Sequence, residues 1–179
     1  MFEQDDRSRL LTIARRALEA RVRREREPVL EGGGALDTPR GAFVSIHHGP
    51  DLRGCLGRIE DDWPIARVVA HLGRAVADSD PRFAPVAAPE LAALVIEVSA
   101  LTPPREVVSL NHIEIGRHGL IVAKGHAHGL LLPQVASERS WDVVTFLSHT
   151  CVKAALPADA WRTGARVWSF EAEVFREGE

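Results

Sequence analysis

The sequence predicts an α+β protein with largely antiparallel sheets and flanking helices. Segments with helical spacing of apolar residues lie near both ends of the chain, and alternating apolar and polar segments joined by short turns lie between them. Strands joined by tight turns pair antiparallel, which favours antiparallel sheets over a parallel α/β arrangement. A chain of 179 residues is long enough for one domain with two lobes. We therefore expect a single domain over residues 1–179, with a smaller hairpin-rich lobe at about 91–133.

The composition is that of an ordinary globular protein and argues against two classes of partner. The net charge of -3 leaves no overall basic surface for nucleic acid. No apolar run is long enough to cross a bilayer, and the acidic start of the chain lacks the basic and apolar regions of a signal peptide. Two cysteines without a framework spacing are typical of reduced thiols in a cytosol. We expect a cytoplasmic protein that binds neither membrane nor nucleic acid.

The first expected element is an amphipathic helix from Ser8 to about Arg26. Apolar residues recur at helical spacing along it, at Leu11, Ala14, Leu18 and Val22. The opposite face is rich in arginine, which would suit an acidic partner, but glutamates alternate with these arginines, as in a solvated surface helix. Pro28 is expected to close the helix.

A β-hairpin is expected next. Residues 41–47 and 52–59 alternate as strands, and the four residues between them are typical of a turn. Alternation gives the second strand two faces, because successive side chains point to opposite sides. One face carries Leu52, Gly54 and Leu56, and the other carries Arg53, Cys55 and Gly57. With the leucines in the core, the arginine and the thiol point out of it together, and the glycines would let a ligand come close.

Cys55 is the residue of this hairpin that suggests chemistry. The guanidinium of Arg53 on the same face would favour the thiolate, which is the nucleophilic form of a cysteine. His47 or His48 could supply a base across the hairpin. Cysteines in tight strands are also often simply buried, so a structural thiol is the alternative. Adjacent histidines point to opposite faces and do not suit one metal ion together with Cys55, so we expect no metal site here.

Carboxylates and prolines indicate where the next helix begins and where it ends in a turn. Residues 61–64 resemble a helix start, with two aspartates and a proline ahead of an apolar stripe that ends near Val76. Asp78 to Phe83 ends that helix, because the residue before a proline disfavours helix. Asp80 and Arg82 flank this proline and could hold each other or a ligand.

Leu94 to Leu101 alternates cleanly and predicts a strand. Glu97 lies in the middle of this strand, between apolar residues. A half-buried carboxylate is stabilised by a cationic partner. Arg53, on a strand of its own, is a geometrically plausible partner, and a salt bridge between Arg53 and Glu97 is the structural alternative to a functional role for either residue.

The second half of the chain predicts further hairpins, a long helix and a last strand. Residues 113–115 and 120–122 flank a turn at Gly116–Gly119, and residues 124–129 form another turn. A helix near 140–156 places Cys151 in the core, with Lys153 off that face. Gln134 follows a strand end, where an amide side chain often points into a cleft. Val167 to Phe175 alternates as the final strand, with one face made of Trp168, Phe170, Ala172 and Val174.

Several of these segments, in this order, resemble the AMMECR-type domain, also called AmmeMemoRadiSam system protein A. They are residues 41–45, the LRGCLG motif Leu52 to Gly57, residues 80–83, 96–101 and 116–120, Leu132 to Ala136, and Cys151 to Leu156. The resemblance covers nearly the whole chain, and the ordered set is highly specific. Two mild departures are Leu56, where the family usually has isoleucine, and Ala155, where it usually has glycine.

The resemblance implies an AMMECR-type fold with two lobes. For function, it implies membership of a pathway but does not name the reaction. Members of the family are encoded beside, or fused to, a Memo-type protein and a radical SAM protein, which implies these partners in a small-molecule or protein-modification pathway. It names no substrate and no cofactor. The chain carries none of the complete phosphate-binding, Cys-x-x-Cys, metalloprotease or serine-hydrolase motifs.

Two kinds of function fit these residues. In the first, the protein is an enzyme component that uses Cys55 with Arg53 as catalytic residues. In the second, it is a non-enzymatic adaptor or ligand-binding domain. The residues expected to bind a small-molecule ligand are Gly54, Gly57, Asp80, Arg82, Gln134 and Lys153. An adaptor should tolerate Cys55→Ser, whereas a nucleophile should not.

Overall fold

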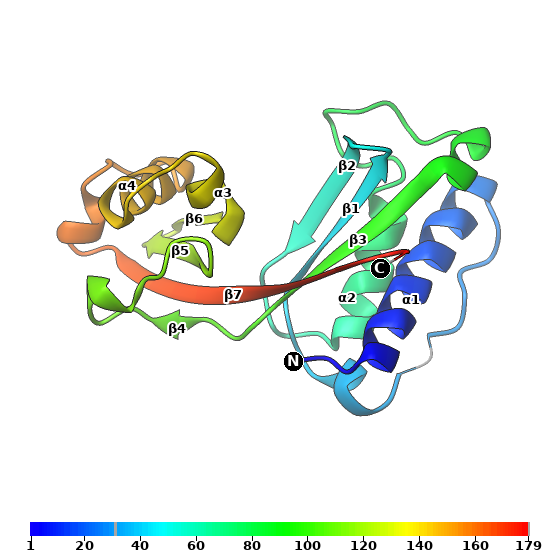
Figure 1. Cartoon of the computed structure of the whole chain (residues 1–179), viewed down its shortest axis with the longest axis horizontal. Helices are drawn as coiled ribbons and strands as arrows, with labels where there is room; N and C mark the ends of the chain where they lie inside the picture. The colour runs from blue at the N-terminus through cyan, green and yellow to red at the C-terminus, as the bar shows by residue number, and fades with distance from the viewer. Residues whose placement is uncertain (31, 179) are drawn as a thin grey trace. The chain divides into compact units, whose positions relative to one another are not determined.

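The computed structural model describes residues 1–30 and 32–178 (Figure 1). The chain divides into two compact units, one of Met1–Leu101 with Glu173–Glu179 and the other of Thr102–Ala172. The second unit thus reaches well beyond the lobe expected at about 91–133, because it also takes in two helices and most of the last strand. No helix within the described residues is both long and apolar enough to span a membrane.

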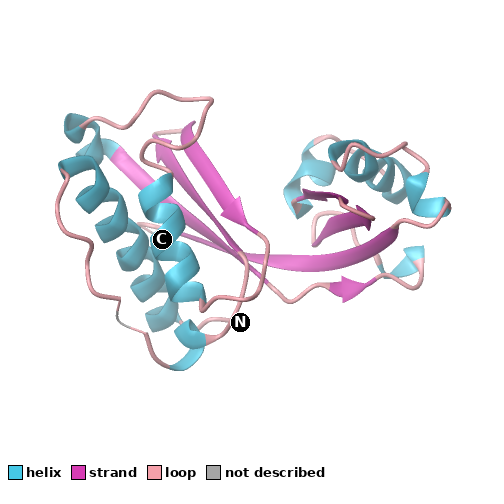
Figure 2. Cartoon of the chain, turned by 180° about the vertical axis from the view of Figure 1, so that it is seen from behind, coloured by secondary structure: helices cyan, strands magenta, loops and turns pink. Residues whose placement is uncertain are grey.

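The first unit is an antiparallel sheet with two helices on one face (Figures 1 and 2). Strands β1 (Ala42–His48), β2 (Asp51–Arg58) and β3 (Leu94–Leu101) have the order β2-β1-β3, so β2 is an edge strand. Helices α1 (Gln4–Arg23) and α2 (Ile65–Ala75) cover the sheet. Short 3-10 helices lie at Gly34–Asp37 and Ala88–Ala93.

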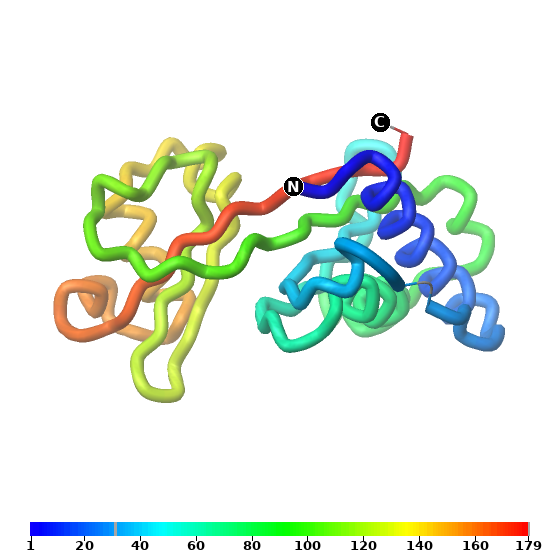
Figure 3. Tube along the Cα trace, turned by 90° about the horizontal axis from the view of Figure 1, so that it is seen from below, coloured from blue at the N-terminus to red at the C-terminus, as the bar shows by residue number. Residues whose placement is uncertain are grey.

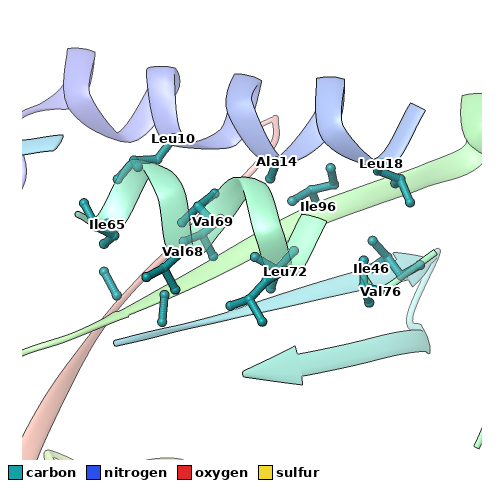
Figure 4. Close-up of a cluster of buried hydrophobic side chains, with 14 of the residues drawn as sticks. Leu10, Ala14, Leu18, Ile46, Ile65, Val68, Val69, Leu72, Val76 and Ile96 are labelled. Carbon is teal, nitrogen blue, oxygen red and sulfur yellow. The ribbon is translucent and has the colours of Figure 1, made fainter. Parts of the chain in front are cut away.

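The core of the first unit lies between this sheet and the helices (Figure 4). Its fully buried side chains come from both helices and from strands β1 and β3, for example Leu10, Leu18, Ile46, Val69 and Ile96. The end of the last strand completes this unit beside the start of α1 (Figure 3), where Glu173 accepts hydrogen bonds from Phe2 and Arg7.

The second unit is a smaller antiparallel sheet with its own helices. Strands β5 (His118–Lys124) and β6 (Ala127–Leu131) form a hairpin, and β5 and β4 (Arg105–Glu106) both pair with β7 (Arg166–Arg176). Helices α3 (Pro133–Glu138) and α4 (Val143–Lys153) follow β6, and 3-10 turns lie at Leu110–His112 and Ala160–Arg162. The core here includes Leu120, Val122, Phe146, Leu147 and Cys151.

Most expected elements are confirmed, with differences at their ends. The first hairpin and the strand Leu94–Leu101 lie where the alternation places them. The first helix ends at Arg23 and not at Pro28, because Arg24 takes a left-handed conformation with φ 58° that caps it. The helix expected near 140–156 is confirmed as α4 but is shorter, since Ser140 has a positive φ and Asp142 caps the start of α4 through the Thr145 amide.

Two expectations for the second half of the chain are wrong. Residues 113–115 form no strand, and the turn at Gly116 leads into β5, whose hairpin partner is β6. The last strand does not keep one apolar face, because Val174 is exposed while Phe175 is buried. The reason is that β7 pairs with β5 only as far as Glu171, and its last residues lie in the other unit beside β3.

Candidate functional site

A β-bulge decides which way the LRGCLG residues of β2 point. The pairing of β1 with β2 shifts between Ile46, which lies opposite Gly54, and His47, which lies opposite Leu52. Arg53 is therefore the extra residue of the bulge. The expected common face of Leu52, Gly54 and Leu56 is wrong at one position: Gly54 and Leu56 face the core, whereas the bulge turns Leu52 out, with 38% of it exposed.

Cys55 lies on the face of the sheet that α1 and α2 do not cover. Its neighbours in β2, Gly54 and Leu56, are paired with the core residues Ile46 and Val44, so alternation sends the thiol to the other side. Cys55 is half-buried and free, so it is not enclosed in apolar packing. The residue therefore keeps some contact with solvent.

An ion pair closes the edge of β2 at Cys55. The Cys55 amide donates to Asp80 Oδ2 at 2.9 Å, and Arg82 Nη2 donates to the Cys55 carbonyl oxygen at 3.3 Å. Asp80 and Arg82 also bind each other, through Nε at 3.0 Å and Nη2 at 2.7 Å. The pair thus takes the place of a neighbouring strand and fixes the backbone of the cysteine.

Asp80 is the buried member of this ion pair, and Arg82 is the exposed member. Its side chain is 3% exposed, whereas that of Arg82 is 58% exposed. The Arg82 guanidinium, with the amides of Cys55 and Arg82, holds the pKa of the Asp80 carboxyl well below its usual range, although burial opposes this. Asp80 in turn raises the pKa of Arg82, and the charge of an ionised Cys55 thiol adds a smaller contribution. Arg82 is therefore a cation that hydrogen-bonds the backbone of Cys55.

Arg53 has a different role from the one expected. Its guanidinium donates to both oxygens of Glu90 at 3.0 Å and to the carbonyl oxygens of Ala84 and Pro85. The expected salt bridge between Arg53 and Glu97 is wrong, because the bulge re-aims Arg53 toward the segment before β3. Arg53 and Arg82 together hold the loop 80–90 against the edge of β2.

Three side chains form a row across the uncovered face. Ser45 of β1 pairs with Cys55 of β2 on one side and with Glu97 of β3 on the other. The Cys55 amide and carbonyl both point outward to the ion pair, so Cys55 and Ser45 form a non-hydrogen-bonded pair, the closer kind, with Cα atoms about 4.5 Å apart. Within the described residues, neither the Ser45 hydroxyl nor the Glu97 carboxylate has a hydrogen bond or ion pair.

His47 belongs to the same face. It lies two residues beyond Ser45 in β1, so its side chain points to the same side. Its Nε2 is buried and has no hydrogen-bond partner among the described residues. An unpaired buried imidazole nitrogen is costly, and such groups are often found where a ligand or a proton is bound. His48, the other candidate base, is exposed on the opposite side of the strand.

The two glycines of the motif are explained by packing. A side chain at Gly54 would meet Val76 Cγ2 at 3.0 Å in the core. At Gly57 it would meet the ring of Phe43 at 2.2 Å, because that ring lies over the glycine from the paired strand. Neither glycine leaves open space for a ligand.

The remaining candidates lie in the second unit. Gln134 is exposed in the first turn of α3, and Lys153 is exposed at the end of α4. Cys151 is fully buried, as expected, and this burial raises the pKa of its thiol. In the part of the chain that the structure describes, no three histidine, cysteine, aspartate or glutamate side chains gather as a metal site would require.

Comparisons with known proteins agree with this fold over almost the whole chain. The AMMECR1 family profile matches residues 11–175. A Methanosarcina mazei protein is 36% identical over 189 residues, covering 100% of this chain and 95% of its own length. Protein MJ0810 of Methanocaldococcus jannaschii is 45% identical over 150 residues, covering 78% of this chain and 74% of its own.

A solved structure gives the same result in three dimensions. The crystal structure of the uncharacterized protein PH0010 from Pyrococcus horikoshii aligns with a TM-score of 0.84 at 38% sequence identity, covering 94% of this chain and 90% of that one. Family profile, sequence relatives and solved structure therefore agree, and the chain belongs to the AMMECR1 family.

Proposed function

We propose that this protein is a cytoplasmic component of a small-molecule or protein-modification pathway, in which the Cys55 thiol acts as a nucleophile. Its partners would be a Memo-type protein and a radical SAM protein. The observation that supports the nucleophile most is the ion pair of Asp80 and Arg82 on both backbone groups of a half-buried, free cysteine. This arrangement fixes the backbone of the cysteine and places the Arg82 guanidinium against its carbonyl oxygen, and an ordered thiol near a cation is what a nucleophilic cysteine needs.

The uncovered face offers the other groups that such a reaction needs. Attack by the sulfur on an electrophilic carbon forms an S–C bond, while the leaving group departs with the bonding pair and the thiol proton passes to a base. His47, with its unpartnered Nε2 on the same face, is the base we propose. Two free cysteines are consistent with the reducing cytoplasm.

The test is the rate of alkylation of Cys55 by iodoacetamide in folded protein. With Cys151→Ala as background, we expect modification at pH 7.5 to be faster in the folded protein than in the same protein unfolded in urea. Cys55→Ser in the otherwise unchanged chain is the control, because its remaining cysteine is buried and should resist the reagent. A Cys55 that reacts only after unfolding would overturn the nucleophile.

The adaptor alternative makes a different prediction with the same variant. A binding domain should still form a complex with the Memo-type and radical SAM proteins after Cys55→Ser, and the product of the pathway should still form. A nucleophile should keep the complex and lose the product. Complex formation measured by ultracentrifugation, beside product formation, separates the two.

A further inference from the structure

Two buried serines lie on the uncovered face of the sheet. Ser45 of β1 is 9% exposed, and Ser99 of β3 is 5% exposed. Within the described residues, neither hydroxyl has a hydrogen bond. A buried hydroxyl without a partner costs free energy, so each one calls for an explanation. The two differ in what lies opposite them in the sheet, because Ser45 is paired with Cys55 whereas Ser99 is paired with Phe43.

The pairing of Ser45 with Cys55 puts their side chains within reach of each other. The Cys55 amide and carbonyl both bind the ion pair at the edge of β2, so the two residues form a non-hydrogen-bonded pair. Side chains are closest in such pairs, with Cβ atoms no more than about 4.5–5.5 Å apart. Ser45 Oγ and Cys55 Sγ each lie one bond beyond Cβ, so staggered rotamers can bring the hydroxyl to the sulfur.

The strength of a bond between these groups depends on the ionisation of the thiol. A neutral thiol is a weak acceptor, so it gives the Ser45 hydroxyl little reason to turn toward it. A thiolate carries a full negative charge and accepts a much stronger hydrogen bond. Because Ser45 is buried, water is a poor substitute for its hydroxyl. A hydrogen bond made mainly to the ionised form stabilises that form.

The charged groups at the edge of β2 do not provide this bond. Arg82 donates to the carbonyl oxygen of Cys55 and is paired with Asp80. Arg53 is paired with Glu90 and with carbonyl oxygens of the loop before β3. Neither guanidinium has a hydrogen bond to the sulfur among the described residues.

The charged groups on the uncovered face largely cancel. The Glu177 amide donates to the carbonyl oxygen of Ile96 at 3.0 Å, which places Arg176 of β7 opposite Glu97 of β3. These two side chains carry opposite charges at neighbouring positions, so their fields at the thiol oppose each other. His47 is the remaining titratable group of this face, and it gains a charge only when it takes a proton.

We infer that Ser45 is a positioning residue whose hydroxyl donates a hydrogen bond to the Cys55 thiolate. On ionisation the S–H bond breaks and its proton passes to His47, while the O–H bond of Ser45 stays intact and turns toward the sulfur. The bond stabilises the thiolate and holds it on the uncovered face. This inference rests on the proposed function, since it names a further residue that activates the same thiol.

The test is the rate of Cys55 alkylation by iodoacetamide from pH 5 to pH 10, with Cys151→Ala as background. Iodoacetamide is neutral, so its rate follows the fraction of thiolate. The midpoint of the rate profile reports ionisation, and the plateau at high pH reports access to the sulfur. Loss of a hydrogen bond to a charged group shifts an equilibrium about ten-fold, so Ser45→Ala should raise the midpoint by about one pH unit. The plateau should stay within about two-fold, because the more basic thiolate is only slightly more nucleophilic.

Matched variants separate the hydroxyl from the packing. Ser45→Thr and Ser45→Val place side chains of the same shape in β1, and only threonine keeps a hydroxyl. Threonine should keep the midpoint of the parent, whereas valine should raise it as alanine does. The control is Ser99→Ala, which removes an equally buried hydroxyl from the same face, opposite Phe43, and should leave the midpoint unchanged.

The outcomes distinguish this inference from the proposed function. If Cys55 of the parent reacts only after unfolding, the thiol is not a nucleophile and both ideas fail. If the folded parent reacts but the alanine and valine variants of Ser45 keep its midpoint, the nucleophile stands and the role of Ser45 is refuted. An equal shift in Ser99→Ala would also refute it, because the effect would then belong to the face as a whole.

Discussion

Replacing Asp80 with asparagine removes the charge that closes the edge of β2. Asp80 is almost fully buried and accepts from the Cys55 amide and from three groups of Arg82, the backbone amide, Nε and Nη2. Asparagine keeps the size but offers only one acceptor oxygen. Its side-chain NH2 group would face one of the N–H donors that now bind the second carboxylate oxygen. Hydrogen bonds to a charged group contribute about 1.5–3 kcal/mol each. Because Arg82 is largely exposed, we discount its share and expect Asp80→Asn to cost about 2–3 kcal/mol.

The same variant changes the pH dependence of stability. The folded pKa of Asp80 is depressed, so its contribution is fully present above the unfolded pKa of about 3.9 and is lost as pH falls toward the folded value. Between pH 5 and pH 3 the wild-type protein should lose about 1.3 kcal/mol through this group. Asp80→Asn lacks the group, so the difference between the two proteins should shrink by that amount.

Urea unfolding followed by far-UV circular dichroism at pH 7.5, 5 and 3 measures both effects. Asp78→Asn is the control, because Asp78 lies in the same segment but forms a surface ion pair with Arg21, worth less than about 1 kcal/mol. An Asp80→Asn protein within 0.5 kcal/mol of wild type at pH 7.5, with a difference that is constant down to pH 3, would refute the role given to this ion pair.

Three further substitutions test the packing of the two units. Gly57→Ala places a methyl group against the ring of Phe43 and should lower the free energy of unfolding by about 1–3 kcal/mol, measured by urea titration. Phe146→Ala empties the centre of the second unit and should cost about 3–5 kcal/mol, seen as faster hydrogen exchange in α4 and β5; unchanged exchange there would contradict it. Cys151→Ser buries a hydroxyl in an apolar site and should cost about 1–3 kcal/mol by thermal unfolding; an unchanged melting temperature would contradict this.

The alternation of apolar residues was sufficient to predict the local elements of the first unit. The strand Leu94–Leu101 and the hairpin around Gly49 appear where the pattern places them. The same pattern also put Cys151 in a core, because helical spacing aligns it with other apolar residues of α4. It failed at Gly116, where turn residues suggested a hairpin, because a turn does not reveal which strand pairs with the next.

The sequence carries a signal for the bulge at Arg53. A two-residue turn that sets His48 opposite Asp51 would, without a bulge, place Val44 opposite Cys55. The thiol would then face the core together with Val44, against the alternation that sends Gly54 and Leu56 there. One extra residue in β2 brings Leu56 opposite Val44, so that the turn and the alternation agree. The conflict between them is the sign in the sequence that β2 contains a bulge.

The sequence by itself determined the fold class, the family and the residue types of the candidate site, because periodicity and motifs are local properties of the chain. The tertiary structure decided which residues meet. In it, Arg53 forms an ion pair with Glu90, and the ion pair of Asp80 and Arg82 binds the backbone of Cys55. The row that joins Cys55 to Glu97 depends on the register of three strands, which non-local packing fixes and a single residue of slip would undo.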